Sequence, residues 1–384
     1  MGDRIPPELI HLIVDHVKDR ESLRACSLVA LIFRAPCQQR LWTTMALRVQ
    51  HDAAIVEPLQ YPHSISTAKS TLEACPHLAS YITCLKLTIV PETTDFAAVG
   101  LASTIKLLPN LTKVSLYPLN EVETSWTDIP DALRSVTESL LEMPTLRQVE
   151  LAFFFAVPRQ LLGRIFAESR CVYLRGIYLE HHKNASEQPS SPSSLERFKT
   201  RTIDIGYYFL PLPFLQPYFC SLRALVLISH RELAIKFVSV LQPLLQVAAT
   251  SPSLEYLSIE LPDYGKNPHG NRRRLQLPPF KRLQYLQVVY EYDSIDSLHE
   301  PPALLLPILH IAESAPVREL CLCSDVCHTD DQPPQRTRAA TDLDSFLARF
   351  LESGERQARG ISRHARSIAA ASVPIGTTGG QFLL

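Results

Sequence analysis

Apolar residues recur at two different spacings along the chain, and the spacing changes after Cys75. Near the amino terminus they occupy positions 9, 10, 13, 14 and 17, the spacing of one face of a helix. Further along, a pattern of the form apolar-x-x-apolar-x-apolar recurs at intervals of about 20 to 35 residues. The first pattern predicts a small helical segment, and the second predicts a series of short buried strands.

Three short helices are expected between Ile5 and Leu47. Pro7 suits the first turn of one helix, Asp19 is a suitable N-cap for a second, and Pro36 limits the third. Three short helices in about 43 residues bury only a small core. Such a segment often needs a partner to cover its apolar face.

Three runs of residues mark this segment. They are Ile5-Pro6-Pro7-Glu8-Leu9, Leu23-Arg24-Ala25-Cys26-Ser27-Leu28-Val29 and Leu41-Trp42. In these runs the segment resembles an F-box, and most of all the F-box proteins of fungi. Where that family usually continues Cys-Arg-Ala-Trp-Arg, this chain has Ala30-Leu31-Ile32-Phe33-Arg34, in which Phe33 can fill the Trp site. The alternative is an ordinary helical cap on a larger domain.

The resemblance implies that the helices dock on a Skp-type adaptor and, through it, on a cullin–RING ubiquitin ligase. We expect the docking residues to be partly exposed in the isolated chain and buried by the adaptor. They are Pro6, Leu9, Ile10, Ile13, Leu28 and Val29. In such a complex the chemistry occurs on other subunits, so the chain is expected to be no enzyme and to need no cofactor.

The strand pattern appears in a series of apolar triplets. They are Ile82-Leu85-Leu87, Leu111-Val114-Leu116, Leu146-Val149-Leu151, Leu174-Ile177-Leu179, Leu222-Leu225-Leu227, Leu254-Leu257-Ile259, Leu283-Leu286-Val288 and Val317-Leu320-Leu322, with a weaker copy at Leu195-Phe198-Thr200. Helical segments are expected before or between them, over 67–75, 98–108, 132–142, 159–168, 233–249 and 303–313. Prolines at 109, 144, 252 and 316 end several of these helices.

A strand followed by a return helix at this interval is typical of a leucine-rich-repeat solenoid, to which residues 76–326 are similar. The expected fold class is α/β: an N-terminal three-helix F-box followed by an irregular leucine-rich-repeat solenoid with parallel strands. The expected domains are the F-box (1–47), a connector (48–75), the solenoid (76–326), and a linker, short helix and disordered tail (327–384). The alternative is a non-repeating α/β domain with leucine-rich strands.

Side chains alternate along a strand, so polar residues beside the buried apolar positions are expected on the opposite face of the sheet. By the resemblance, that face binds the protein to be ubiquitinated. The candidate substrate-binding residues are Tyr178, Glu180, Arg197, Lys199, Arg201, Tyr256 and Tyr285. Tyrosine and arginine are enriched at binding hot spots, and the three basic residues of the weak copy favour an acidic or phosphorylated segment. The alternative is a solvated strand face.

Composition narrows the class of protein. The formal net charge is -1, so no global field favours nucleic acid or an anionic membrane. The 9 cysteines are scattered and mostly lie in apolar patterns, which is typical of reduced thiols in a cytoplasmic or nuclear protein. The most apolar stretch, 203–228, is interrupted by prolines and charges and predicts no membrane span.

Few residues have the spacing of a catalytic or metal site, and no nucleotide-binding, serine-hydrolase or metalloprotease motif occurs. Cys321, Cys323, Cys327 and His328 form one dense cluster that could hold zinc, although thiols in a strand are more often simply buried. Glu150 and Glu180 are predicted on separate strands, which favours no catalytic pair. Other charged or polar runs have ordinary explanations. His181-His182 ends a predicted strand as a polar rim, Arg272-Arg273-Arg274 is a solvated loop, and Arg356, Arg359, Arg363 and Arg366 solvate the tail. Asn184-Ala185-Ser186 matches a glycosylation acceptor, but nothing in the sequence places the chain in the secretory pathway.

These observations favour the substrate-recognition subunit of an SCF-type (Skp adaptor–cullin–F-box) ubiquitin ligase. Two alternatives stay open: a repeat scaffold that binds a partner without any ligase, and an enzyme whose site is assembled from distant loops.

Overall fold

The computed structural model describes residues 5–49, 63–90, 95–180, 193–201, 212–228, 234–261, 278–292, 315–326 and 381–383, together with residues 305, 308, 309 and 311. The chain divides into two compact units, residues 1–185 and 186–384, which are called the first and the second unit below.

The first unit begins with three helices, α1 (Pro7–His16), α2 (Arg20–Val29) and α3 (Leu31–Trp42). Pro7 lies in the first turn of α1, and Asp19 caps α2 by accepting a hydrogen bond of 2.7 Å from the Ser22 backbone N–H, as predicted. Pro36 lies inside α3, so the prediction that it limits this helix was wrong. The helix continues past Pro36, and Cys37 and Leu41, which follow it, lie in or against the small core of the three helices.

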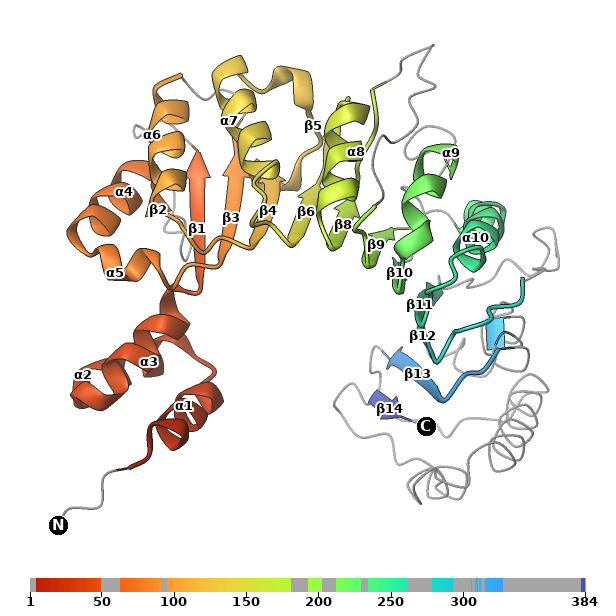
Figure 1. Ribbon diagram of the computed structural model, residues 1–384, viewed down its shortest axis with the longest axis horizontal. Helices are drawn as coiled ribbons and strands as arrows, with labels where there is room; N and C mark the ends of the chain where they lie inside the picture. Colours follow the sequence, from red (N-terminus) through yellow and green to blue (C-terminus); the bar gives the residue numbers. More distant parts are fainter. Residues whose placement is uncertain are drawn as a thin grey trace. The chain divides into compact units, whose positions relative to one another are not determined.

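The rest of the first unit is a parallel sheet with helices on one of its sides (Figure 1). Its strands follow the order β2 (His63–Ser64), β1 (Thr44–Val49), β3 (Cys84–Ile89), β4 (Lys113–Pro118), β6 (Gln148–Ala152) and β8 (Cys171–Arg175). Its helices are α4 (Ile65–Ala74), α5 (Pro76–Ala79), α6 (Asp95–Lys106), α7 (Asp131–Leu141) and α8 (Arg159–Glu168). Figure 1 shows α6, α7 and α8 on the same side of the strands.

A short excursion follows β4. It contains the 3-10 helices η1 (Leu119–Glu121) and η2 (Trp126–Asp128) and the strand β5 (Thr124–Ser125), which pairs with β7 (Phe154–Phe155). Trp126 is buried edge-on against the Phe154 ring, and its indole N–H donates to Glu138 of α7 at 3.1 Å. The excursion is therefore packed onto the helical side of the unit.

The second unit, taken by itself, also consists mainly of parallel strands. It contains β9 (Arg197–Arg201), β10 (Ala224–Ile228), β11 (Tyr256–Leu261), β12 (Tyr285–Tyr292) and β13 (Glu319–Val326), all parallel, and β14 (Gln381–Leu383), which is antiparallel to β13. In the sequence, α9 (Leu212–Leu215) and η4 (Gln216–Ser221) come between β9 and β10, and α10 (Ala234–Ala249) comes between β10 and β11. Residues 305, 308, 309 and 311 are helical and buried, as the pattern over 303–313 predicts.

Neighbouring strands are joined by backbone hydrogen bonds that begin one residue before each strand. Thr112 N–H donates to Thr83 O at 2.9 Å, and Arg147 N–H donates to Thr112 O at 2.8 Å. In the second unit Glu255 N–H donates to Arg223 O at 2.9 Å. These bonds place the first residue of each strand level with that of the next one.

The α/β class and the parallel strands were predicted correctly. The strand leucines and isoleucine expected to be buried are all 0% exposed: Leu116, Leu151, Leu227 and Ile259. The predicted helix over 159–168 matches α8, and the bounds of α6, α7 and α10 differ by a few residues from those expected. None of the described helices has the length and apolar character needed to cross a membrane.

Candidate docking surface

The three N-terminal helices are held together by a small apolar core. Val14, Leu23 and Cys37, one from each helix, are buried in it. Val17, Cys26, Phe33 and Leu41 pack against it and stay partly exposed. Burial raises the pKa of the Cys37 thiol, which keeps it neutral and suits a packing role. Phe33 thus packs against the core from the position where the F-box pattern usually has Trp.

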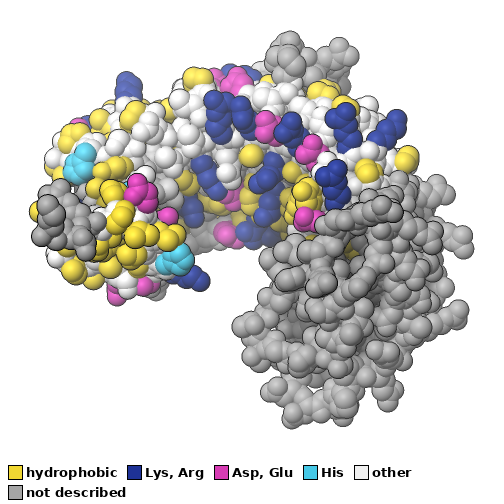
Figure 2. Space-filling model, turned by 60° about the horizontal axis from the view of Figure 1, so that its bottom comes forward, with side chains coloured by type: hydrophobic (Ala, Val, Ile, Leu, Met, Phe, Trp, Pro, Cys, Tyr) yellow, Lys and Arg dark blue, Asp and Glu magenta, His cyan; other side chains and the backbone are white. Residues whose placement is uncertain are grey.

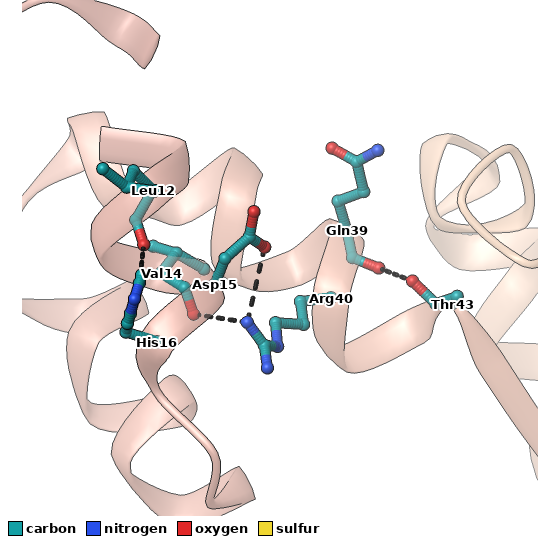
Figure 3. Close-up of polar contacts among 7 residues, drawn as sticks. All are labelled: Leu12, Val14, Asp15, His16, Gln39, Arg40 and Thr43. Atoms are coloured by element: carbon teal, nitrogen blue, oxygen red, sulfur yellow. Dashed lines mark hydrogen bonds and ion pairs between the residues drawn. The ribbon is translucent and has the colours of Figure 1, made fainter. Parts of the chain in front are cut away.

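Polar contacts fix α1 against α3 (Figure 3). The Arg40 guanidinium donates to the Val14 backbone carbonyl at 2.8 Å and contacts the Asp15 carboxylate at 3.4 Å. The end of α1 is closed by a hydrogen bond of 2.8 Å between the His16 ring and the Leu12 carbonyl. Because Arg40 binds a main-chain oxygen of the last turn of α1, it sets the position of this helix.

Most of the large apolar side chains that are exposed in the described residues lie on these three helices or just before α1. They are Ile5, Leu9, Leu12, Ile13, Leu28, Val29, Leu31 and Ile32, with exposed fractions from 48% for Leu9 to 81% for Leu28. Figure 2 shows hydrophobic side chains gathered over this part of the first unit. Exposed apolar residues that gather in one place are typical of an interaction surface, whereas single ones are ordinary.

Five of the six residues predicted to dock on the adaptor are exposed, namely Pro6, Leu9, Ile13, Leu28 and Val29. The sixth, Ile10, is only 6% exposed, so the prediction that it is accessible was wrong. Ile10 lies one turn before Val14 on the inner side of α1, and the apolar stripe of this helix divides between an inner and an outer side.

Sequence reasoning missed Leu12, Leu31 and Ile32, which belong to the same exposed apolar set. A signal for two of them was present. Leu31 stands where the F-box pattern usually has Arg and Ile32 where it has Ala, and together they make the start of α3 more apolar than a solvated helix needs to be. Several apolar residues that gather at positions outside the core indicate an interaction surface.

On the side of the sheet away from the helices, the strands carry polar side chains. In the first unit the Ser115 hydroxyl donates to the Glu150 carboxylate at 2.9 Å. Burial and a hydrogen bond with Glu150 raise the pKa of Tyr117, which therefore stays protonated. Figure 2 shows Lys and Arg side chains, with some Asp and Glu, gathered over the strands.

In the second unit the predicted face residues lie on three strands. Arg197, Lys199 and Arg201 alternate along β9, while Tyr256 begins β11 and Tyr285 begins β12. The Tyr256 hydroxyl donates to the Gln287 side chain, which also accepts from the Ser258 hydroxyl at 3.2 Å. The structure thus places these predicted residues on three strands of one unit, with β10 between β9 and β11.

Tyr178 and Glu180 were assigned to a strand of this face, and that assignment was wrong. β8 ends at Arg175, and its buried residues Val172 and Leu174 pair with Val149 and Leu151 of β6. Tyr178 lies beyond the end of β8, and its hydroxyl donates to Glu123 of the excursion at 3.1 Å. Tyr173 and Arg175 take the strand positions instead.

Other candidate chemistry is scattered. Glu150 lies in β6 and Glu180 beyond β8, and Cys321 and Cys323 lie in β13. Among the described residues, no three His, Cys, Asp or Glu side chains are placed to hold a metal ion. The remaining candidates lie outside the described residues: Cys327, His328, His181, His182, Asn184, Ala185, Ser186, the arginines 272–274, and Arg356, Arg359, Arg363 and Arg366.

No protein-family model matches the chain, and no curated protein matches its sequence. The interpretation of the helices and strands therefore depends on their own residues and geometry.

Proposed function

We propose that this protein is the substrate-recognition subunit of an SCF-type ubiquitin ligase. In this proposal α1, α2 and α3 form an F-box that docks on a Skp-type adaptor and, through it, on a cullin–RING ligase. The observation that carries the proposal is the exposed apolar set at these helices, which lies in and beside the runs that resemble an F-box.

Three features of the helices support the F-box assignment. Pro7 and Glu8 open α1, the Leu23–Val29 run lies within α2, and Leu41-Trp42 ends α3. The runs that carry the resemblance therefore fall on three successive helices. The small core explains why these helices benefit from a partner, since few side chains are buried by the chain itself.

The sheet supports the second half of the proposal, a leucine-rich-repeat solenoid that binds the substrate. Purely parallel sheets usually have both faces covered by helices. Here helices occupy one side of the first unit, and polar side chains such as Lys86, Glu150 and Tyr173 lie on the other face. A parallel sheet with one polar face is typical of repeat proteins that bind along it. The substrate contacts we propose are Arg197, Lys199, Arg201, Tyr256 and Tyr285.

The roles of the two parts follow from this division. Adaptor binding buries side chains such as Leu9, Ile13 and Leu28, each with about 1.5–3 kcal/mol of hydrophobic free energy before the cost of association. Ubiquitin transfer occurs on other subunits, so the chain's contribution is to hold the substrate near them. We place this complex in the cytoplasm or nucleus.

Co-purification with a Skp-type adaptor tests the proposal. The protein with Leu9→Asp and Ile13→Asp should lose the adaptor, because two charges then lie where apolar contact is needed. The matched control is Val99→Asp with Val122→Asp, which changes two exposed apolar residues of the first unit outside the three helices. It should retain the adaptor.

Equal recovery of the adaptor with both double variants would contradict the proposed docking surface. If the unchanged protein does not bind the adaptor at all, the ligase assignment fails. The repeat-scaffold alternative then has to be tested with partners captured from cells by proximity labelling.

A further inference from the structure

One strand of the second unit carries a row of positive charges. Arg197, Lys199 and Arg201 alternate along β9 with Phe198 and Thr200, which are both 0% exposed. Because successive side chains of a strand point to opposite faces, the three cations share the face away from the core. We call these three residues the basic row.

An apolar row lies directly beside the basic row. The parallel register pairs Lys199 with Val226 and Arg201 with Ile228 of β10. Val226 and Ile228 are both partly exposed on this face. On the next strand Tyr256 and Ser258 continue the face. Positive charge, apolar surface and tyrosine therefore follow one another across three neighbouring strands.

Acidic residues on the same face are separated from the basic row. Glu260 belongs to β11 and Glu319 to β13, whereas the cations are all on β9. Lys199 and Arg201 also interact within the chain, so an incoming group must share or replace those interactions. On this face, β9 therefore presents positive charge and the neighbouring β10 presents apolar surface.

The spacing of the cations indicates the shape of the ligand. Residues two apart in a strand are separated by about 6.6 Å, so the row extends over roughly 13 Å. An extended peptide presents alternate side chains at the same interval. A line of carboxylates therefore fits this row better than one phosphate group, which would need cations converging on a single point.

We propose that the basic row and the apolar row together bind an extended segment with Asp or Glu at alternate positions, in a partner protein that becomes the ubiquitination substrate if the proposed function holds. The carboxylates pair with Arg197, Lys199 and Arg201. Val226 and Ile228 exclude water beside these pairs, which strengthens the charge interactions because the local dielectric is lower.

The probe is a short fluorescein-labelled peptide in which Glu alternates with Thr, and binding to the full-length protein is measured by fluorescence anisotropy. A second peptide of the same composition has its Glu residues side by side, and a third has one phosphoserine and no Glu. The alternating peptide should bind most tightly, and its affinity should fall as salt is raised.

The test variant carries Arg197→Glu, Lys199→Glu and Arg201→Glu, and we expect about tenfold weaker binding or more. The matched control carries Arg223→Glu, Lys281→Glu and Arg282→Glu. It makes the same change of charge at exposed positions of the same unit outside the strands. The control should bind like the unchanged protein. Thermal unfolding followed by circular dichroism checks that both variants fold.

Three results would overturn the proposal: equal affinity for the alternating and clustered peptides, tighter binding of the phosphoserine peptide, or the same loss in both triple variants. If the test variant does not fold, the single change Lys199→Gln takes its place. It should weaken binding of the alternating peptide and make that binding less dependent on salt. The protein with Leu9→Asp and Ile13→Asp should bind the peptide normally. Failure of adaptor docking and failure of this site are therefore distinguished.

Discussion

The N-terminal helices and the strands of the first unit carry similar apolar side chains, but these side chains differ in how far they are buried. Along β3, β4 and β6 the inward leucines and valines are fully buried, as Leu87, Val114 and Val149 show. On α1, Leu9 and Ile13 are about half exposed although Ile10 and Val14 are buried. Apolar content alone therefore does not identify a core. In the helices part of it stays accessible, and we interpret that part as a binding surface.

The cause of the difference is the number of neighbours that each element has. A central strand has a strand on each side and helices over its inner face, so an inward side chain is enclosed. α1 and α2 pack mainly on α3, and their outer sides keep large apolar residues such as Leu9 and Leu28 exposed. Three predictions test this comparison.

The largest effect is expected for a strand leucine. Leu151→Ala should lower the free energy of unfolding by about 2–5 kcal/mol, because it leaves a cavity among fully buried side chains. Leu28→Ala should change it by about 0.5 kcal/mol or less, because Leu28 is already in water. Urea unfolding measured by circular dichroism and tryptophan fluorescence compares the two. Similar losses would show that the helices and strands do not differ as described.

A smaller effect is expected from neighbouring positions of α1. Ile10→Asp places a carboxylate on the buried side of α1 and should unfold the three helices, whereas Leu9→Asp should leave them folded. The loss of stability cannot exceed the stability of the three helices, which is small because their core is small. Hydrogen exchange measured by mass spectrometry should show faster exchange over residues 7–42 in the first variant. Equal protection in both would contradict the division of α1 into an inner and an outer side.

The smallest effect concerns Tyr117 on the open face of the sheet. Its pKa is raised above the ordinary value of about 10, so its contribution to stability is fully present below that pH and is lost as the pH rises further. Tyr117→Phe removes the hydroxyl and should cost about 1 kcal/mol near neutral pH. Above pH 10 the difference between the two proteins should shrink. Urea unfolding over a pH series provides the measurement. A difference in unfolding free energy between the two proteins that grows with pH would contradict the prediction.

Much of the fold could be predicted from the sequence because burial has a regular spacing. Triplets such as Leu146-Val149-Leu151 specify both a strand and its inward face, and α8 was predicted at its observed bounds. These features depend on residues that are neighbours in the chain or one repeat away. Local pattern is sufficient for them.

Two features depend on distant residues and were assigned incorrectly. The stripe at positions 9, 10, 13 and 14 is apolar throughout, and only the packing of the folded chain shows that Ile10 and Val14 are buried while Leu9 and Ile13 are exposed. Near β8, both Val172-x-Leu174 and Ile177-x-Leu179 satisfy the strand pattern, and all four residues are buried. Gly176, with φ of 61°, separates them, and pairing with β6 selects the first.

The level start of neighbouring strands has a consequence for how such a chain can change over evolutionary time. Lys113 of β4 lies beside Cys84 of β3 and beside Gln148 of β6, at the same level of the sheet. A stretch that begins at Lys113 and ends just before Gln148 therefore contains one strand and its return path, and gain or loss of such a stretch leaves the alignment of every other strand unchanged. Insertions between strands are likewise neutral for alignment. Genes of this type can drift in length and duplicate internally while the encoded sheet persists.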